Sequence, residues 1–382
     1  MRVPPAAISF SSEDISQITA ELSESLTTGA LTLGKHGQQF EEEFAALCGV
    51  PYAVAVNSGT SALEIVLRAI GVENREVIVP TNTFFATAAA VIHAGGRVRF
   101  ADCEPGSFAL DVGSLRECLN ANTAAVILVH IGGIISPRLA DISQICHQVG
   151  VPLIEDAAHA QGSTLGAQTA GGFGIAAAFS FYPTKVITSA EGGMITTSDE
   201  ALYREALIYR DQGKEGFTTN YHVRLGYNWR MSEPHAIIGR VQLRRLLEFI
   251  DRRREIAQVY DRRLAGFRGG LRPLSVPRGV QSNYYKYIAL LDPAIARAAL
   301  KKAMRDEFDV GLSGEVYETP CHQQPVFRGY PAGRLHQAER ICAEHICLPI
   351  SAKMTAEEAE YVVDSLERAL ELTQTAPAAV GD

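Results

Sequence analysis

Short apolar runs and stretches with helical spacing alternate along the middle of the chain. The apolar runs cover residues 53–56, 75–80, 97–102, 124–130 and 151–157, and each has the length of one buried strand. Between them apolar residues recur every three or four positions, as in Leu63, Val66, Leu67 and Ile70, which predicts helices with one apolar side. Such alternation favours a mostly parallel sheet with helices on both faces. We therefore expect a three-layer α/β/α fold.

Further elements are predicted on either side of this region. Two amphipathic helices are expected at 13–28 and 40–50, before the alternation begins. After it we expect strands in FGIAAAFSF and MITT, a helix at 199–213 and a loop-like stretch at 214–230. A long helical pattern then runs from Ser232 to about residue 264, with arginines interleaved among acidic residues. This mixture is typical of a solvated or interdomain helix, not of a nucleic-acid surface.

The composition changes after the long helical pattern, which indicates a domain boundary. The stretch FRGGLRPLSVPRG is rich in glycine and proline, and beyond it a strand, NYYKYIALL, is followed by helical patterns. We predict a large domain over 1–250, a smaller C-terminal α+β domain over 251–374 and a flexible tail over 375–382. A chain of 382 residues can bury two such cores.

Charge and cysteine content narrow the class of protein. The net charge of -8 argues against a nucleic-acid binder, whose surface is usually basic. Seven scattered cysteines without a Cys-x-x-Cys pair fit reduced thiols in the cytoplasm. We recognise no signal peptide, and no apolar run approaches the roughly 20 residues of a membrane helix. The expectation is a cytoplasmic protein that binds neither nucleic acid nor membrane.

One lysine stands at the end of an apolar run instead of on a charged helix. In AFSFYPTKVITSAEGGM, residues 178–194, Lys185 follows a Tyr-Pro-Thr turn and precedes Glu-Gly-Gly. Most lysines are solvated surface groups, so Lys185 taken alone is weak evidence of function. It becomes a candidate for chemistry because other reactive groups are expected at the same edge of the sheet.

Several of these groups follow predicted strands, where α/β sheets place their sites. Gly59 and Thr60 begin a helix after the run 53–56, where free N–H groups could hold a phosphate or simply be capped. Phe84 begins another helix and is by default a core residue. Asp156 follows a buried run, where a carboxylate needs a cationic partner or an N-cap. A metal shared with His159 would need a third ligand, so we predict no metal site.

Two motif-like stretches are interpreted as structural. The segment 29–36 begins like a phosphate loop, but His36 replaces the Ser or Thr that binds magnesium, and the segment follows a helix. A possible zinc trio lacks a second Cys or His pair at finger spacing, so core positions are favoured for Cys342, His345 and Cys347.

Lys185, Asp156, Gly59 with Thr60, and Phe84 together have the chemistry that pyridoxal phosphate (PLP) requires. The lysine amine forms a Schiff base with the aldehyde, and the carboxylate keeps the pyridine nitrogen protonated. Helix-terminal N–H groups hold the phosphate, and an aromatic ring stacks on the cofactor. Spacing along the chain does not by itself bring these residues together.

The chain resembles the DegT/StrS family of sugar aminotransferases, which have the aspartate-aminotransferase-like fold (fold type I). The resemblance covers nearly the whole chain, through FEEEFAALCGV, NSGTSAL, VPTNTFFATAAAV, EDAAHAQGS, FSFYPTKVITSAEGGMITT and GYNWRMSEPHAIIGRVQL. The last three blocks together are highly specific for the family.

The resemblance assigns a role to each candidate in the cofactor site. It implies that Lys185 bonds the cofactor and moves the proton between cofactor and sugar carbons. Asp156 would pair with the pyridine nitrogen, and Phe84 would stack on the ring. His159 falls where the family has Gln or His, near the phenolic oxygen of the cofactor.

The phosphate contacts implied by the resemblance come from two subunits. The Ser180 hydroxyl and the amides of Gly59 and Thr60 would hold the phosphate. Asn228, in GYNWR, resembles the asparagine that reaches the phosphate from the neighbouring subunit. A homodimer with shared active sites is therefore expected.

The chain departs from the family pattern beside the expected substrate site. After His130, IGGIISPRLADI is longer than the Gly-x-Pro turn of many relatives, a difference that would reshape the site. The stretch YETPCHQQPVFRG, 317–329, resembles the substrate-side loop of the family. Tyr317 and His322 are accordingly predicted to contact the sugar.

The activity implied is transfer of an amino group, expected from L-glutamate, to a ketosugar carried on a nucleotide diphosphate, in deoxyaminosugar biosynthesis. A family-like sugar dehydratase is the close alternative, but dehydratases replace the lysine with histidine, so Lys185 favours aminotransfer. A PLP-dependent desulfurase or lyase would want a reactive cysteine in a matched motif. A catalytically idle regulatory protein of the same fold is the remaining alternative, and no DNA-binding segment supports it.

Overall fold

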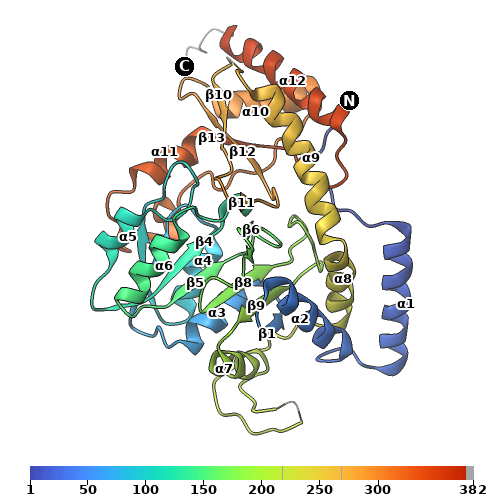
Figure 1. Ribbon diagram of the computed structural model, residues 1–382, viewed down its shortest axis with the longest axis vertical. Helices are drawn as coiled ribbons and strands as arrows, with labels where there is room; N and C mark the ends of the chain where they lie inside the picture. The colour runs from blue at the N-terminus through green and yellow to red at the C-terminus, as the bar shows by residue number, and fades with distance from the viewer. Residues whose placement is uncertain (217, 268, 376–382) are drawn as a thin grey trace.

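A seven-stranded sheet forms the centre of the computed structural model, which describes residues 1–216, 218–267 and 269–375 (Figure 1). In spatial order the strands are β1 (Tyr52–Val56), β9 (Gly193–Thr197), β8 (Ala176–Ser180), β5 (Leu153–Asp156), β4 (Thr123–Val129), β2 (Glu76–Pro80) and β3 (Arg97–Ala101). Neighbouring strands are parallel except at β9, which runs antiparallel to both β1 and β8. The prediction of a mostly parallel sheet is confirmed.

Successive residues of the strands point into two separate cores, so the sheet is the middle of three layers. In β1, Val54 and Val56 belong to one core, while Ala53 and Ala55 belong to the other. The first core is closed by α3 (Gly59–Ala69), α4 (Phe85–His93) and α7 (Glu200–Arg210). The second is closed by α2 (Lys35–Cys48), α5 (Val112–Cys118), α6 (Leu139–Gln148) and α8 (Glu233–Arg244). Burial on both faces explains why the strands read as continuous apolar runs.

A smaller antiparallel sheet lies above the large one in Figure 1 and has a core of its own. Its strands are β10 (Leu271–Pro273), β12 (Tyr287–Leu291) and β13 (His345–Leu348), in that spatial order. The helices that cover it are α9 (Leu246–Leu264), α10 (Arg297–Phe308) and α12 (Ala356–Thr375), whereas α11 (His336–Glu344) packs on the first core of the large sheet. The smaller α+β part expected at the C-terminus is present.

Helix α9 joins the two parts of the molecule. Phe249 and Ile250 contribute to a core of the large sheet, and Ile256 and Tyr260 contribute to the core of the small one. Val3, from the N-terminal end, also packs into the small core. The division at residue 250 stays a prediction. Of the predicted tail over 375–382, Thr375 is the last residue of α12, and residues 376–382 lie outside the described residues.

The long helical pattern after Ser232 is divided into two helices, so the prediction of one continuous helix is wrong. Helix α8 ends at Arg244 and α9 begins at Leu246. The Arg245 amide donates to the Gln242 carbonyl three residues back, a tighter turn than the α-helical one. No glycine or proline marks this position, so the break had no local sequence signal.

Three short strands outside the large sheet were not predicted. Strands β6 (Thr164–Leu165), β7 (Gln168–Thr169) and β11 (Val280–Gln281) form a separate three-stranded sheet. The 3-10 turns η1 (Ile131–Gly133), η2 (Cys321–Gln323) and η3 (Pro325–Phe327) are equally short. Elements of two or three residues carry too few positions for a periodic pattern.

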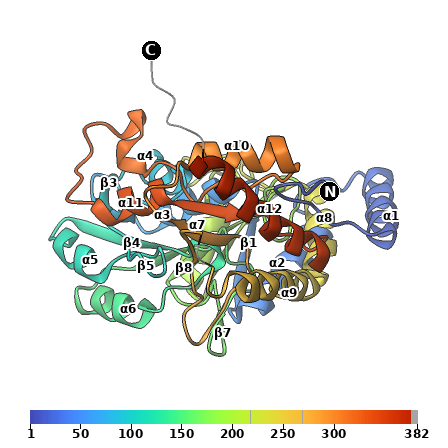
Figure 2. The same ribbon diagram turned by 90° about the horizontal axis from the view of Figure 1, so that it is seen from above.

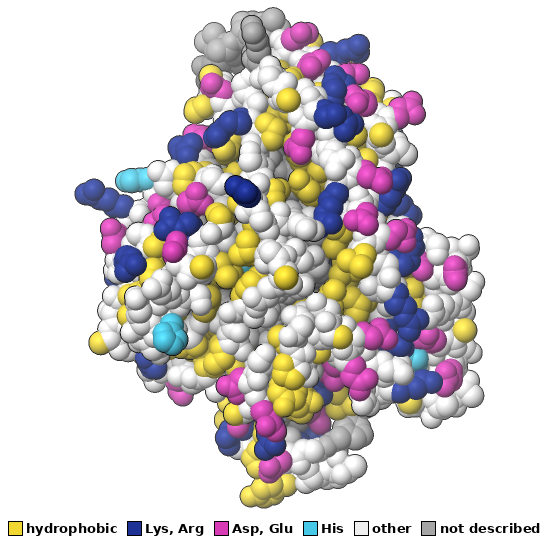
Figure 3. All heavy atoms as spheres, in the orientation of Figure 1, with side chains coloured by type: hydrophobic (Ala, Val, Ile, Leu, Met, Phe, Trp, Pro, Cys, Tyr) yellow, Lys and Arg dark blue, Asp and Glu magenta, His cyan; other side chains and the backbone are white. Residues whose placement is uncertain are grey.

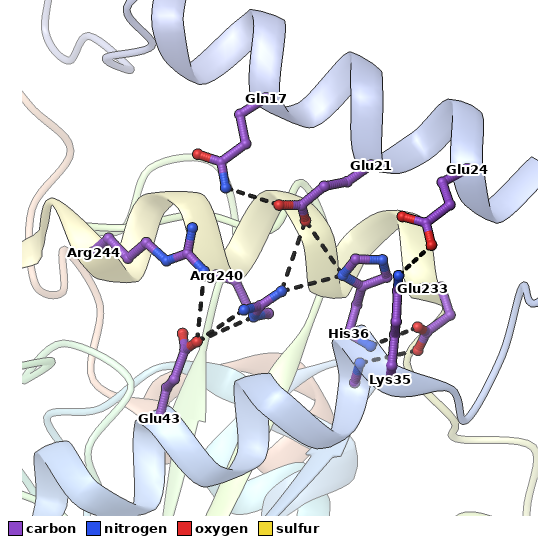
Figure 4. Close-up of polar contacts among 10 residues, drawn as sticks. Gln17, Glu21, Glu24, Lys35, His36, Glu43, Glu233, Arg240 and Arg244 are labelled. Atoms are coloured by element: carbon purple, nitrogen blue, oxygen red, sulfur yellow. Dashed lines mark hydrogen bonds and ion pairs between the residues drawn. The ribbon is translucent and has the colours of Figure 1, made fainter.

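The segment that resembled a phosphate loop binds a carboxylate of its own chain (Figure 4). The amides of Gly34, His36 and Gly37, at the start of α2, donate to the buried Glu233 carboxylate at 2.8–3.0 Å. Lys35 points instead to Glu24 on α1 (Ser12–Thr28). The anion that this helix N-terminus favours is therefore supplied by α8.

Charges of both signs mix along the face of the molecule shown in Figure 3. On α9, Arg252 pairs with Glu255 at 2.6 Å, and Arg254 pairs with Asp251 at 3.5 Å. The interleaved pattern predicted a solvated or interdomain helix, and α9 combines exposed ion pairs with side chains buried in both cores. Within the described residues, no helix is both long and apolar enough to cross a membrane.

Candidate cofactor site

The carboxyl ends of β4, β5 and β8 open into a cavity of about 410 Å³, next to the first residues of α3 and α4. This is the edge of the sheet at which a site was expected. The predicted site residues that line the cavity are Gly59, Thr60, Phe84, Asp156, His159, Ser180, Lys185 and Tyr317. Residues from five separate stretches of sequence therefore meet in one place.

Lys185 is held at the cavity by a turn that follows β8. Its amide donates to the Tyr182 carbonyl at 2.9 Å, and its Nζ lies 4.9 Å from the centre of the Tyr285 ring. Burial lowers the pKa of Lys185 to about 8, the Asp156 carboxylate opposes this shift, and the Lys286 ammonium adds to it. The side chain is half-buried by surface area, so solvent screens part of these effects.

Asp156 lies at the end of β5 with 5% of its surface exposed. Thr87 Oγ1 donates to Asp156 Oδ2 at 2.6 Å, and the Ala158 amide donates to Oδ1 at 3.2 Å. Burial raises the pKa of Asp156, while these two hydrogen bonds and the charge of Lys185 oppose the rise. A carboxylate in this environment gains stability from a cationic partner.

The first turn of α3 packs directly against the end of β8, with Gly59 next to Ser180. Ser58 is the N-cap of α3, and its hydroxyl accepts from the Ser61 amide. The Gly59 and Thr60 amides do not bond to this hydroxyl and remain available to a ligand. A Cβ added at Gly59 would lie 2.9 Å from Ser180 Cβ, so glycine is required there. The amides and the Ser180 hydroxyl can therefore contact one anion in the cavity.

Phe84 is exposed at the mouth of the cavity and is not a core residue. Its side chain is 56% exposed, and its ring centre lies 5.7 Å from that of Tyr317. It occupies the N-cap position of α4 without making a capping hydrogen bond. An exposed aromatic ring at a cavity mouth is available to stack on a planar ligand.

Hydrogen bonds fix the tautomer of His159. The Gly132 amide donates to Nδ1 at 3.3 Å, so the ring proton is on Nε2, which lies 3.1 Å from the Tyr317 hydroxyl. Burial lowers the pKa of His159 well below its usual range, and the charges of Lys185 and Lys286 act in the same direction. A neutral His159 therefore donates to Tyr317, which leaves the Tyr317 proton free for another acceptor.

Two predicted site residues lie outside the cavity. His322 is bonded to Thr81 Oγ1 at 2.8 Å and to Glu339 Oε1 at 3.0 Å. Asn228 is exposed and pairs with Asp211 through the backbone. A single chain therefore does not bring either side chain into its own cavity.

Two residues of the site were missed by the sequence analysis. Thr87 donates its one hydroxyl hydrogen to Asp156 and therefore accepts from the Thr83 hydroxyl, four residues earlier, at 2.7 Å. The four-residue spacing of Thr83, just before α4, and Thr87, inside it, was the available signal. Tyr285 is close to both Lys185 and His159, with its ring centre 4.9 Å from Lys185 Nζ and 4.3 Å from the ring centre of His159. The pattern in NYYKYIALL predicts Tyr285 to be part of a strand, whereas Tyr285 precedes β12 and reaches the site through packing between the two sheets.

Glu155, next to Asp156, has a structural function that was also missed. It is fully buried and accepts from the amides of Gly171, Phe173 and Gly174 at 2.7–3.0 Å. His130 Nε2 lies 2.9 Å from the same carboxylate. These contacts satisfy a buried charge and fix the strand end that presents Asp156.

Metal ligation is not indicated among the described residues, where no three His, Cys, Asp or Glu side chains group closely enough to hold an ion. Cys342, His345 and Cys347 are buried in packed positions, as expected. His345 donates from Nδ1 to Ile341 and accepts at Nε2 from the Val316 amide, which uses both ring nitrogens.

The geometry fits PLP. One cavity is lined by a half-buried lysine, a buried carboxylate, helix-terminal amides and an exposed aromatic ring. Because Gly59 has no side chain, its amide can come close to a bound phosphate. The fold and site together define a PLP-dependent enzyme with an open α/β sheet.

Comparison with known proteins identifies the group within this class. Residues 12–367 match the DegT/DnrJ/EryC1/StrS aminotransferase family, so the chain belongs to this family. The "Pleiotropic regulatory protein" of Geobacillus stearothermophilus is 32% identical over 96% of this chain and 98% of its own. The UDP-N-acetyl-3-dehydro-alpha-D-glucosamine 3-aminotransferase of Acidithiobacillus ferrooxidans is 32% identical over 93% and 94%.

A solved structure shows the same fold. NtdA from Bacillus subtilis, crystallised with its bound cofactor PMP, is 26% identical and superposes with a TM-score of 0.87. The superposition covers 95% of this chain and 83% of NtdA. The expected family, fold and enzyme class are confirmed.

Proposed function

We propose that this sugar aminotransferase transfers an amino group from L-glutamate to a keto group of a sugar carried on a nucleoside diphosphate. The observation that carries the proposal is the meeting of Lys185, Asp156 and the α3 N-terminus in one cavity. The relative from Acidithiobacillus ferrooxidans is named for a keto sugar on UDP, which supports this substrate class.

The chain's own residues have complementary tasks around the cofactor. PLP supplies, when bound, an aldehyde for attachment and a ring that accepts electrons. Asp156 would hold a proton on the ring nitrogen, because its buried carboxylate favours a cation. The Gly59 and Thr60 amides with the Ser180 hydroxyl would bind the phosphate, and Phe84 would cover the ring.

Lys185 would bond the cofactor and then carry the proton. With a pKa of about 8, about one tenth of its amine is neutral at pH 7, against well under a thousandth for an ordinary lysine. A neutral amine can attack an aldehyde or accept a proton from carbon. The low pKa therefore suits both tasks.

Tyr317 is the better placed of the two predicted sugar contacts. Its hydroxyl accepts from His159, so its own proton can be donated to a sugar oxygen in the cavity. His322 would have to break its bonds to Thr81 and Glu339 to reach the substrate. We propose Tyr317 as a direct contact and His322 as a support for the loop.

A homodimer would complete the site. Asn228 is exposed and lies outside the cavity of its own chain. It could therefore enter the cavity of a second subunit. Helix α1, at the edge of the molecule in Figures 1 and 2, turns polar Asp14 toward Arg245 and leaves Ile15 and Leu26 56% and 63% exposed. A second chain could cover these two exposed side chains.

The proposal is tested by following the cofactor's absorbance in two half-reactions. Glutamate should convert the PLP form to the pyridoxamine form, and a nucleotide-linked ketosugar should reverse the change. Glutamine and a panel of sugars differing in nucleotide and keto position test the specificity. Failure of every amino donor to change the spectrum would contradict the proposal.

The alternatives make different predictions in the same experiment. A dehydratase would eliminate water from the sugar without consuming glutamate, and Lys185 argues against it. A regulatory protein is suggested by the name of the Geobacillus stearothermophilus relative. Such a protein would bind PLP yet leave glutamate unchanged, although the complete set of reactive residues gives it no structural support.

A further inference from the structure

Two lysines contact the ring of Tyr285, and the proposed chemistry uses one of them. Lys185 Nζ lies 4.9 Å from the ring centre, and Lys286 Nζ lies 5.3 Å from it. The two nitrogens are therefore no more than about 10 Å apart. Like charges at this distance in a partly buried region disfavour one another.

Lys286 is fixed to the wall of the site by its backbone. Its amide, directly before β12, donates to the Gly132 carbonyl at 3.3 Å, and the Gly132 amide donates to His159. Its position therefore depends on the same extended turn, IGGIISPRLADI, that replaces the shorter family turn.

The Lys286 charge is not cancelled by an ion pair within the described part of the chain. The nearby carboxylate, Glu315, is bonded by Lys301 Nζ through both oxygens at 2.7 and 2.8 Å. Arg253, another buried cation close by, donates to the Tyr284 and Ile350 carbonyls. A half-buried ammonium without a carboxylate partner acts on other groups at longer range.

We propose that Lys286 is a positioning residue that increases the neutral fraction of Lys185, because it places a second positive charge beside the same Tyr285 ring. This inference rests on the proposed role of Lys185 in bonding the cofactor and carrying the proton. It adds a residue that the family comparison does not assign to the reaction.

The other ionisable groups around Lys185 do not replace this effect. They are Asp156, His159, Tyr182, Glu191, Tyr285 and Tyr317. The Asp156 charge favours the protonated form of Lys185. In the holoenzyme this carboxylate would pair with the ring nitrogen of the cofactor instead. Burial is the main cause of the lowered pKa of Lys185 and of His159, and the Lys286 charge, from outside the cavity lining, lowers both further.

The test compares the purified holoenzyme with Lys286→Met and Lys286→Arg variants. Methionine keeps most of the apolar stem and removes the charge, whereas arginine keeps the charge. The pH titration of the cofactor's visible absorbance should shift its midpoint up by about 0.5–1 unit in Lys286→Met. Lys286→Arg should titrate within about 0.2 units of the unaltered enzyme.

Measurements on the cofactor-free protein keep the test decisive. Carbon-13 NMR of reductively methylated Lys185 should show a similar rise of the Lys185 pKa in Lys286→Met. Lys286→Gln takes its place if Lys286→Met folds poorly. Unchanged titration in a folded, uncharged variant would overturn the inference. An unaltered enzyme that binds no PLP would instead contradict the proposed function, so the two failures are distinguishable.

Discussion

At the scale of single residues, function depends on how the fold treats charge at two positions. Asp156 is a carboxylate buried beside a hydroxyl and an amide, and Lys185 is an amine whose positive form is disfavoured. Each is costly without a partner, and each gains from one cofactor group. The sequence identified both residues because each follows an apolar run, where a charged side chain is unusual.

The lowered pKa of Lys185 predicts how cofactor attachment depends on pH. The protonated amine does not attack an aldehyde, so the rate at which PLP bonds to the cofactor-free protein should rise through pH 6–8 and level off above about pH 8. Stopped-flow absorbance measures this rate. A rate that continues to climb to pH 10 would show an ordinary lysine.

At the scale of elements, the sequence predicted regular, buried structure well and irregular contacts poorly. Strands β1, β2, β4 and β5 were found because a buried strand needs a continuous apolar run. The break at Arg245 was not predicted, because no glycine or proline marks it. The position of Tyr285 was not predicted, because Tyr285 reaches the site only through packing between the two sheets. Candidate residues were recognised by their place after a strand, but their meeting in one cavity required the fold.

Gly59 is predicted to be irreplaceable because α3 and β8 approach closely. In Gly59→Ala, the added Cβ would lie 2.9 Å from Ser180 Cβ and displace the amides that face the cavity. We expect the dissociation constant for PLP to rise at least about tenfold, measured by fluorescence titration. Gly314→Ala is the matched control, because an added Cβ there meets nothing within 4 Å. Equal affinity in both variants would refute the phosphate assignment.

Glu233 is predicted to stabilise the start of α2. In Glu233→Ala, three amides lose their acceptor, so the free energy of unfolding should fall by about 1–2 kcal/mol. Glu24→Ala, which removes an exposed pair with Lys35, should leave the free energy of unfolding nearly unchanged. Denaturant titrations compare the two, and similar losses would show that the capping contacts contribute little.

At the scale of the whole molecule, one chain presents a cavity, an exposed Asn228 and an edge helix with exposed apolar residues. A dimer in which each chain places its Asn228 in the cavity of its partner would account for these features. A protein with a net charge of -8 and mixed charges along α9 does not attract an anionic substrate at long range. A nucleotide-linked sugar would therefore have to be bound by groups inside the cavity.

The shared site predicts complementation between two impaired variants. A dimer formed from Lys185→Ala and Asn228→Ala chains contains one site with both residues intact if Asn228 serves its partner. Random reassortment after mixing should then restore about one quarter of the normal activity. If Asn228 serves its own chain, every mixed site remains impaired and no activity returns.

The most direct test of the central claim is the absorbance spectrum of the purified protein with PLP and glutamate. The unaltered protein should show a visible band that borohydride abolishes and that glutamate converts to the pyridoxamine form. Lys185→Ala should lose both the borohydride-sensitive attachment and turnover, with Lys35→Ala as the exposed-lysine control. A Lys185→Ala protein that completed amino transfer at the normal rate would contradict the account.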